Sequence, residues 1–281
     1  MKVWVTGAKG LVGGHVLQRV ADCVGSGREV DIADEAQVRL FIEKNGPFTH
    51  IFNCAAFSAV DLAESCREKA LRDNVQGPHV LGKVASEKGI KLLHLSTDYV
   101  FSGCGDRLLT EEDEPSPCNY YGWTKLEGEK CLQNIYPAAC IIRTSWVFGQ
   151  GGKNFAVKVL QWLQEKERLD IVFDQVSRYT YAPDLVLAMV QMADGAGVYH
   201  FANSGVSNKY EFTQIIQEEA LQRGFSLRCR SIEPVKSSAF AAAAQRPAFS
   251  PLDTQKIQKV LGAAPRHWKD ALIDYLDGYA S

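Results

Sequence analysis

The sequence lacks the cysteine and histidine patterns that mark zinc sites. None of its 8 cysteines belongs to a CxxC pair, and no cluster of histidine and cysteine has the spacing of zinc ligands. These absences remove the usual sequence evidence for a structural metal. We therefore expect free thiols and a reducing, cytoplasmic location.

Long apolar stretches and a strong excess of charge are also missing. No apolar run approaches the roughly 20 residues of a membrane span. The first residues, MKVWVTGAKG, show neither the apolar stretch nor the cleavage site of a signal peptide. The net charge of −2 gives no reason to expect a nucleic acid or an acidic membrane as partner.

The first half of the chain alternates short apolar runs with helical patterns. This alternation predicts an α/β fold with a Rossmann-type, doubly wound parallel sheet, whose ligands bind beyond the carboxyl ends of the strands. The expected strands lie at 2–8, 23–32, 49–57, 90–101 and 139–149, and the expected helices at 11–21, 35–46, 61–88 (interrupted at Gly77-Pro78) and 120–134.

The second half is less regular and predicts a smaller C-terminal lobe. With 281 residues the chain is long enough for two closely joined domains. We expect a dinucleotide-binding domain at 1–149, and at 150–281 mostly a substrate-binding lobe with segments that return to the sheet. Helices are expected near 153–167, 183–194, 208–224, 253–262 and 267–279, and loops at 174–182 and 229–251.

A glycine-rich loop follows the first expected strand. Gly7, Gly10 and Gly13 have GxxGxxG spacing in VTGAKGLVGG. Gly7 permits a tight turn, Gly10 lets the backbone approach a pyrophosphate, and Gly13 lets the next helix pack closely on the strand. The helix start adds free N–H groups and positive potential. Together these features predict a dinucleotide site, whereas the triplet alone would fit a structural turn.

The sequence leaves the choice of dinucleotide open. Arg28, close to Ser26, suits the 2′-phosphate of NADPH, but it fits a solvated turn residue equally well, so NADH stays possible. Asp31 lies where a carboxylate could accept a hydrogen bond from the adenine amino group. It could instead cap the helix that follows.

Tyr121 and Lys125 are four residues apart in a predicted helix and therefore share one face. An ammonium beside a phenol would lower the pKa of the phenol and make it a usable acid or base. Tyr120 would face elsewhere, which favours Tyr121 as the proton donor. On its own, the YxxxK spacing often occurs by chance, and an ordinary amphipathic helix would explain it.

A strand that ends in hydroxyl residues gives the YxxxK pair its chemical context. Ser96 or Thr97, at the end of LSTDYVF, would present a hydroxyl to the ligand crevice. A hydroxyl, a tyrosine and a lysine around a nicotinamide form a carbonyl-reducing site, in which the hydroxyl polarises the carbonyl and the tyrosine donates a proton. Without the glycine loop, the same residues would read as a polar strand end before a turn.

Several motifs in this order give the chain a resemblance to a known family. They are the glycine loop, NCAAFSAVDLAES (53–65), LSTDYVFSG (95–103), YGWTKLEGEK (121–130), RTSWVFG (143–149), GKNF (152–155), DQ (174–175) and RPAFSPLD (246–253). Over most of its length the chain resembles the extended short-chain dehydrogenase/reductases, and within them the dTDP-4-dehydrorhamnose reductase family.

The resemblance implies a role for each matching residue. Thr97 would polarise the carbonyl, Tyr121 would donate the proton and Lys125 would be its partner. Trp146 also has an alternative interpretation as a core aromatic. Implied cofactor contacts are Gly10, Leu11 and Val12 with the pyrophosphate, Asp31 and Ile32 with adenine, and Ala55, Ala56 and Ser58 beside the nicotinamide ribose, with Leu95 behind; Thr97, Asp98 and Trp146 would hold the deoxyhexose ring.

The implied activity is reduction of the C4 keto group of dTDP-4-dehydro-L-rhamnose to dTDP-L-rhamnose. Another nucleotide-linked 4-keto-6-deoxyhexose, or a non-catalytic dinucleotide-binding regulatory subunit, remain alternatives. A 4,6-dehydratase is disfavoured because Thr97 is followed by Asp98 and Tyr99, where that chemistry needs two adjacent carboxylates.

The chain also departs from the family pattern. Cys54, Phe57 and Ser58 replace usual residues, and DQVSRYTYAPDL (174–185) leaves Arg178 and Tyr179 without a role. Some family members pair through a bound magnesium ion, but no carboxylate cluster suggests one here. We expect no metal, a nucleotide sugar as the small-molecule partner, and a homodimer as one option for assembly.

Overall fold

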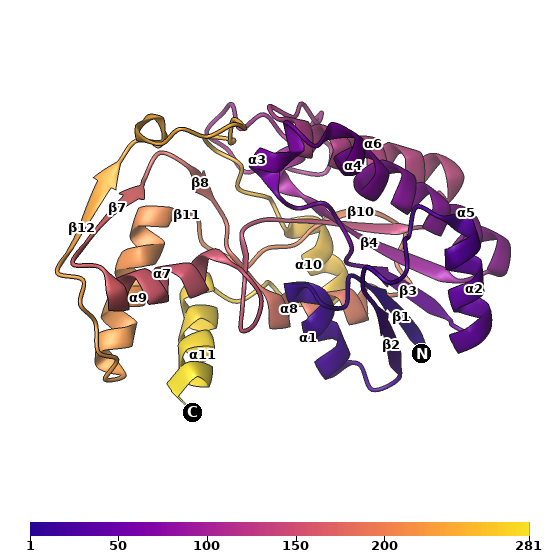
Figure 1. Cartoon of the computed structure of the whole chain (residues 1–281), viewed down its shortest axis with the longest axis horizontal. Helices are drawn as coiled ribbons and strands as arrows, with labels where there is room; N and C mark the ends of the chain where they lie inside the picture. Colours follow the sequence, from indigo (N-terminus) through magenta and orange to yellow (C-terminus); the bar gives the residue numbers. More distant parts are fainter. Residues whose placement is uncertain (281) are drawn as a thin grey trace.

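A six-stranded parallel sheet forms the centre of the larger part of the molecule (Figure 1). The computed structural model describes residues 1–280. The strand order β10-β5-β4-β3-β1-β2 reverses direction at β1, as in doubly wound folds, so the predicted Rossmann-type α/β class is confirmed. The strands are β1 (Val3–Thr6), β2 (Cys23–Ser26), β3 (His50–Asn53), β4 (Lys91–Thr97), β5 (Cys140–Thr144) and β10 (Gly197–His200).

Helices cover both faces of this sheet because its strands are apolar on both sides. Val3 and Val5 pack into one core with α1 and α8, while Trp4 points into the opposite core with α2 and α5. The helices of this part are α1 (Leu11–Arg19), α2 (Glu35–Asn45), α3 (Val60–Ala63), α4 (Arg67–Leu71), α5 (Gly77–Lys88), α6 (Tyr120–Ile135), α8 (Ala182–Gln191) and α10 (Gln255–Leu261).

A smaller lobe has a separate, largely aromatic core. Tyr179, which the sequence left without a role, is 1% exposed and stacks on Phe212 with ring centroids 3.7 Å apart. The elements of the lobe are α7 (Phe155–Glu165), α9 (Lys209–Gln222), α11 (Trp268–Ala280), β6 (Val147–Phe148), β7 (Arg168–Val172), β8 (Val176–Ser177), β9 (Thr180–Tyr181), β11 (Ser207–Asn208) and β12 (Ser231–Val235).

The chain crosses between the two parts several times. After β9 it returns to the sheet with α8 and β10, goes back to the lobe with α9 and comes back once more with α10 (Figure 1). The division into residues 1–149 and 150–281 stays a prediction. The topology brings segments that are far apart in sequence to the junction between the sheet and the lobe.

Three local expectations differ from the structure. The strand expected at 139–149 is two strands in different sheets, because Trp146 adopts a φ of 41° that a strand cannot contain. Gly77-Pro78 does not interrupt the helix; a π-helical turn, Arg72–Gln76, leads directly into α5, where proline at the helix start loses no hydrogen bond. Finally, β7 and β10 occupy segments for which the sequence predicted no strand.

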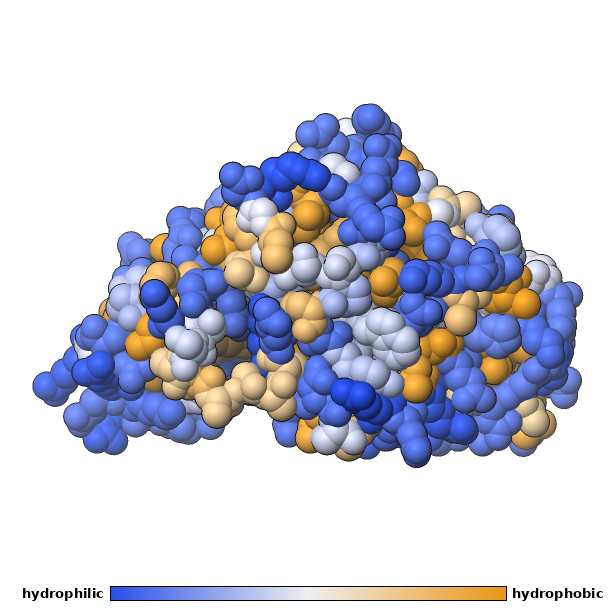
Figure 2. Space-filling model, turned by 90° about the horizontal axis from the view of Figure 1, so that it is seen from above, coloured by the Kyte–Doolittle hydropathy of each residue, from blue (hydrophilic) through white to orange (hydrophobic). Residues whose placement is uncertain are grey.

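Polar and charged side chains cover most of the face shown in Figure 2, and hydrophobic side chains lie there in small groups. Isolated exposed apolar side chains of this kind are normal for a folded protein and need no partner to explain them. Within residues 1–280, none of the helices has both the length and the apolar character needed to cross a membrane.

A buried ion pair holds α6 against the sheet. Arg143 on β5 makes hydrogen bonds of 3.0 and 2.7 Å to the two carboxylate oxygens of Glu129 on α6. The two side chains are 5% and 1% exposed. Since α6 carries Tyr121 and Lys125, this pair fixes the position of the helix on which the predicted chemistry depends.

We expect Glu129→Ala to lower the free energy of unfolding by about 3–5 kcal/mol, because it leaves the Arg143 guanidinium buried without its counter-ion. The matched control is Glu127→Ala on the same helix, whose carboxylate pairs with the exposed Lys130 and should cost less than about 1 kcal/mol. Chemical denaturation measures both. Equal losses in the two variants would contradict a special role for the buried pair.

Candidate active site

The glycine loop lies against the loop that follows β3. Gly7 has a φ of +65°, and the Gly10 N–H donates to the Gly7 carbonyl at 2.9 Å, which closes a tight turn. A Cβ added at Gly7 would lie 2.7 Å from backbone atoms of both Cys54 and Ala55. Any side chain at residue 7 would therefore separate the two loops at the point where the sheet order reverses.

The start of α1 fits a pyrophosphate. A Cβ at Gly13 would lie 2.4 Å from the Gly7 carbonyl oxygen, so only glycine allows this close packing of helix on turn. Gly10 faces open space apart from the Gly7 carbonyl, and no side chain caps the helix, so N–H groups of the first turn, which includes Leu11 and Val12, stay available. These features match the roles that the sequence predicted for the three glycines.

A buried chain of hydrogen bonds runs from the first strand to Lys125. Thr6 donates to Asn53 Oδ1 (2.6 Å), Asn53 Nδ2 lies 2.8 Å from His94 Nδ1, and His94 Nε2 lies 3.2 Å from Lys125 Nζ. Lys125 also donates to the Leu95 carbonyl at 2.7 Å. The chain connects β1, β3, β4 and α6. Sequence reasoning assigned no role to Asn53 or His94, and nothing in their spacing indicated one.

These contacts bear on the charge of Lys125. Asn53 Oδ1 already accepts from Thr6, so its amide nitrogen donates to His94 Nδ1 and the ring proton of the neutral imidazole lies on Nε2. Burial, helped by Lys125, keeps the pKa of His94 well below its usual value. A ring N–H that faces Lys125 favours the neutral amine, and burial lowers the Lys125 pKa to about 8.

Tyr121 and Thr97 come together at the end of β4. Asn119 caps α6 by accepting from the Gly122 N–H at 2.8 Å, and the helix starts at Tyr120. Burial raises the pKa of Tyr121 to about 12, and the nearby Thr97 hydroxyl partly opposes this rise. The expected lowering of the Tyr121 pKa by Lys125 is therefore wrong. The Lys125 amine is occupied by His94 and the Leu95 carbonyl.

Tyr120 faces away from the pair, as expected. Its ring lies 5.2 Å from that of Trp123 and 4.8 Å from the Arg67 guanidinium.

Asp98 ties the lobe to the end of β4. Its carboxylate accepts from Ser250 (2.6 Å), from Ser177 on β8 (3.3 Å) and from Thr97 (3.2 Å). The side chain is 1% exposed, and burial raises its pKa to about 6. The predicted contact of Asp98 with a sugar stays a prediction, while its hold on two lobe segments is visible in the structure.

Trp146 lies at the junction between sheet and lobe. Its φ of 41° is costly for a bulky side chain and is the single left-handed non-glycine residue among residues 1–280. Its ring makes an edge contact with Tyr179 at 4.9 Å and lies 5.3 Å from the ammonium of Lys209. The side chain is partly exposed and packs against the aromatic core of the lobe, so the sugar contact and the core-aromatic interpretation both stay predictions.

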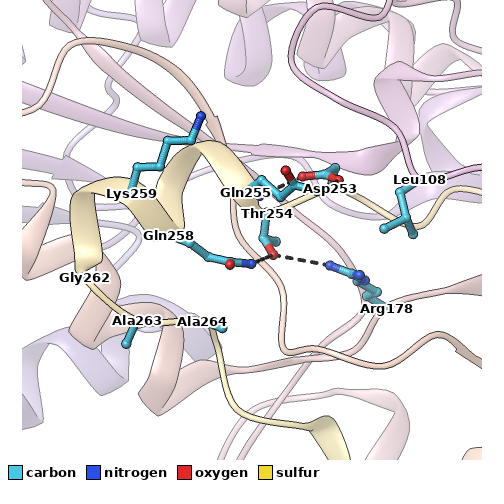
Figure 3. A pocket seen from close by; sticks show the side chains of 10 residues that line it. All are labelled: Leu108, Arg178, Asp253, Thr254, Gln255, Gln258, Lys259, Gly262, Ala263 and Ala264. Carbon is cyan, nitrogen blue, oxygen red and sulfur yellow. Dashed lines mark hydrogen bonds between the residues drawn. The ribbon is translucent and has the colours of Figure 1, made fainter.

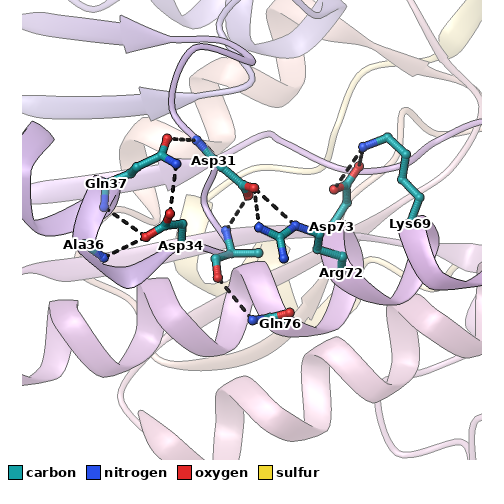
Figure 4. A network of polar contacts seen from close by, with 9 residues as sticks. Asp31, Asp34, Ala36, Gln37, Lys69, Arg72, Asp73 and Gln76 are labelled. Atoms are coloured by element: carbon teal, nitrogen blue, oxygen red, sulfur yellow. Dashed lines mark hydrogen bonds and ion pairs between the residues drawn. The ribbon is translucent and has the colours of Figure 1, made fainter.

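Asp31, which the sequence predicted to contact adenine, belongs to a polar network near α2 and the π-helical turn (Figure 4). Asp31 accepts from the Arg72 guanidinium (2.5 Å) and from the Ala33 N–H (2.9 Å). The helix cap is Asp34, which accepts from the N–H groups of Ala36 and Gln37, so the capping alternative for Asp31 is wrong. Ile32 is buried beside Asp31 and packs on α5.

Beyond the end of β2, the structure shows a carboxylate that sequence reasoning missed. Glu29 accepts from the Gly27 N–H at 2.5 Å and pairs with Lys9 of the glycine loop at 3.2 Å. Arg28 is exposed. An acid at this place favours a ribose diol and a cation favours a 2′-phosphate, so the site holds both kinds of group. The sequence REV (28–30) contained the signal that was missed, an acidic residue shortly after the second strand.

The remaining predicted cofactor residues follow β3 and end β4. Ala55 donates its N–H to Asn53 Oδ1 at 3.2 Å, which holds the start of the loop. Ala56 and Ser58 are exposed, and Leu95 is partly exposed on β4. Their contacts with a nicotinamide ribose stay predictions.

Arg178 lies outside this constellation. It lines a cavity of about 640 Å³ beside α10, together with Asp253, Thr254 and Lys259 among other residues (Figure 3). Its guanidinium donates to the Thr254 hydroxyl at 3.3 Å. None of the predicted site residues lines this cavity.

In the part of the chain that the structure describes, no group of three or more histidine, cysteine, aspartate or glutamate side chains could hold a metal ion. The expectation of no metal stays a prediction.

Comparison with known proteins identifies the family. The family profile described as "RmlD substrate binding domain" matches residues 1–281. The chain belongs to this family. It is 34% identical to the spore coat polysaccharide biosynthesis protein SpsK of Bacillus subtilis (100% of this chain, 98% of the relative) and 32% identical to the dTDP-4-dehydrorhamnose reductase of Aggregatibacter actinomycetemcomitans (96% and 97%).

A solved structure supports the same assignment. The dTDP-4-dehydrorhamnose reductase of Bacillus anthracis, in complex with NADP, has a TM-score of 0.92 and 29% identity, and the match covers 99% of this chain and 100% of that chain. The family resemblance read from the motifs is confirmed. The family match spans the sheet and the lobe together.

The lowered pKa of Lys125 has a measurable consequence for stability. The folded-state pKa of about 8 lies below the ordinary 10.5, so the unfolded chain binds more protons between these values. The cost of burying the ammonium is therefore relieved as the pH rises. We compare the Tm of Lys125→Met with that of the parent. The difference, variant minus parent, should be highest at about pH 7 and lower by a few degrees at about pH 9.5, because the parent gains stability as the pH rises.

The control for this measurement is Lys130→Met on the exposed side of α6, whose Tm difference should not change with pH. Thermal denaturation of the three proteins across this pH range gives the comparison. A Lys125→Met difference that is flat with pH would show that folding does not lower the pKa of Lys125.

Proposed function

We propose that this chain is an NADPH-dependent reductase that converts dTDP-4-dehydro-L-rhamnose to dTDP-L-rhamnose. The observation that carries the proposal is that Tyr121 and Lys125 of α6 lie at β4, with the Tyr121 phenol beside Thr97 and the Lys125 amine on the Leu95 carbonyl. The glycine loop follows β1 of the same sheet. Membership in a family that includes dTDP-4-dehydrorhamnose reductases supports the choice of substrate.

The protein residues divide the chemistry between them. The bound nicotinamide supplies the hydride that reduces the sugar C4. Tyr121 delivers a proton to the alkoxide oxygen, and a phenol whose pKa is raised to about 12 is fully protonated at neutral pH, which is the form that a reduction requires. Thr97 turns its hydroxyl from Asp98 toward the same oxygen and stabilises the charge that develops there.

Lys125 contributes a cation next to the ribose side of the site. Its amine is held by the Leu95 carbonyl and His94 in the free protein. The hydroxyl oxygens of a nicotinamide ribose can accept hydrogen bonds from the ammonium, whereas the His94 ring N–H cannot. We expect Lys125 to bind that ribose and to become more strongly protonated when it does so.

Cofactor selection follows from the groups beyond β2. The relative from Bacillus anthracis was solved with NADP. In this chain Lys9 and Arg28 offer cations to a 2′-phosphate, while Glu29 occupies Lys9 and the Gly27 N–H. We therefore expect NADPH as the main cofactor, with NADH accepted because Glu29 can take a hydrogen bond from the 2′-hydroxyl.

Two alternatives differ in what they require of the site. A reductase of another nucleotide-linked 4-keto-6-deoxyhexose would use the same residues with a different fit of the sugar. A dinucleotide-binding regulatory subunit would have no need of Thr97, Tyr121 and Lys125 together. The homodimer and the cytoplasmic location stay predictions.

The proposal is tested by following NADPH and NADH oxidation with dTDP-4-dehydro-L-rhamnose as substrate. Turnover, with dTDP-L-rhamnose as the product by chromatography, supports the reductase. Absence of turnover in a protein that binds NADPH would reject this substrate. Turnover with a different dTDP-4-keto sugar would then select the first alternative.

Tyr121→Phe should lower kcat by about 10²–10⁴-fold, because it removes the proton donor and leaves the cofactor site intact. The Kd for NADPH should stay within about twofold of the parent. Stopped-flow or steady-state absorbance gives kcat, and fluorescence gives NADPH binding. The matched control is Tyr120→Phe, whose ring faces Trp123, and which should keep near-parental kcat. Parental kcat in Tyr121→Phe would exclude Tyr121 as the acid.

Glu29→Gln should raise the ratio of kcat/KM for NADPH over NADH by about tenfold, because it removes a carboxylate that repels the 2′-phosphate and frees Lys9 to bind it. The control is Glu43→Gln, an exposed acid on α2. An unchanged ratio in Glu29→Gln would mean that the carboxylate does not face the adenosine ribose.

A further inference from the structure

Lys209 is a cation that the predicted chemistry does not use, and it lies beside the predicted sugar site. It is the first residue of α9 and directly follows β11, which pairs with β8. Its ammonium donates to the Gln175 amide oxygen at 2.8 Å and lies 5.3 Å from the centre of the Trp146 ring. It also lies 6.0 Å from the ring of Phe155, so two aromatic faces hold it in place.

The charge of Lys209 has no direct counter-ion. Among residues 1–280, no carboxylate lies within ion-pair distance of its ammonium. Burial lowers its pKa to about 8, and the nearby cation Arg246 lowers it further, while Asp98 and Asp174 act in the opposite direction. An ammonium that is largely removed from water without a paired anion is costly unless a ligand completes it.

Both nearby acids are already bound to other groups. Asp98 accepts hydrogen bonds from Ser177 and Ser250, and burial raises its pKa to about 6. Asp174 accepts from the N–H and the hydroxyl of Ser237. Neither carboxylate is free to turn toward Lys209. Arg246 already pairs with Asp61. The charge left to balance is therefore that of Lys209, and its anion must come from outside the chain.

We infer that Lys209 binds the diphosphate of the nucleotide-sugar substrate. This inference rests on the proposed function, because the diphosphate is the anionic group of such a substrate. Only one of the three N–H donors of the ammonium is used, so two remain for phosphate oxygens. A neutral sugar hydroxyl would not balance the Lys209 ammonium, whereas a diphosphate does.

The position of Lys209 agrees with the path of an extended substrate. Ser177 on β8 reaches Asp98 at the end of β4, and Lys209 lies at the next position of the β8–β11 ribbon, opposite Gln175. Trp146 lies between this ribbon and the sheet. A sugar over Trp146 would reach Thr97 at one end while its diphosphate meets Lys209 at the other. Nothing in the sequence motifs around SNKYEF indicated this role.

The test uses dTDP as the probe, so that it does not depend on turnover. Lys209→Gln should weaken dTDP binding at least about tenfold by calorimetry, as expected for loss of a charge-assisted phosphate contact. The Kd for NADPH should not change. The matched control is Lys158→Gln on α7, an exposed lysine of the same lobe, which removes the same charge and should leave dTDP binding within about twofold.

A second variant separates a binding role from a structural one. Lys209→Arg keeps the cation and should retain dTDP affinity within about threefold, even if the glutamine variant folds poorly. Loss in Lys209→Arg as large as in Lys209→Gln would overturn the inference. So would a parallel loss of NADPH affinity, because that would indicate a general disturbance of the crevice.

Two further outcomes separate failure of the diphosphate assignment from failure of the reductase proposal. If dTDP binding is unchanged in Lys209→Gln but the KM for the keto sugar rises, Lys209 contacts the sugar and the diphosphate assignment is wrong. If the parent protein binds dTDP through Lys209 but reduces no dTDP-4-keto sugar, the reductase proposal fails while the inference about Lys209 stands.

Discussion

The buried hydrogen-bond chain from Thr6 through Asn53 and His94 to Lys125 is the contact on which the rest of the site depends. It joins three neighbouring strands to the helix that carries the predicted acid. Polar groups buried this deeply must all find partners, so the chain has essentially one arrangement. That arrangement fixes the distance between the glycine loop, where a pyrophosphate would lie, and the lysine that would meet the nicotinamide ribose.

The electrostatics of the crevice suit a reduction. Burial raises the pKa of Tyr121 and lowers that of Lys125, so the phenol keeps its proton and the lysine holds its proton less tightly than an exposed lysine would. A protonated phenol is the right starting state for a donor, because an alkoxide is a stronger base than a phenolate. The crevice therefore needs no cation beside the phenol to make it an acid, and the lysine is left to serve the cofactor.

The lobe is attached to the sheet through a few polar contacts at the reacting end. Asp98 accepts hydrogen bonds from a serine on β8 and a serine in the segment before α10. Trp146 lies between β5 and β6 and has a strained backbone conformation. The same short region brings Lys209 and Gln175 to the crevice. Sugar contacts and lobe placement are thus coupled, so changes at Asp98 would affect both the position of the lobe and the shape of the sugar site.

The sequence by itself determined five of the six strands of the sheet and the local motifs, while β10 was missed. Its strand and helix alternation, the spacing of Gly7, Gly10 and Gly13, and the i,i+4 relation of Tyr121 and Lys125 are short-range patterns, and each depends on backbone geometry within a few residues. The family resemblance followed from the order of such patterns along the chain.

Only the tertiary structure decided the partners of those residues. His94 beside Lys125, the serines on Asp98, Glu29 against Lys9, and Lys209 over Trp146 join residues from 20 to more than 100 positions apart. The pKa of Tyr121 was misjudged for the same reason. Helical spacing placed a lysine on its face, but burial and the competing acceptors of that lysine come from β4, which no local pattern could connect to it.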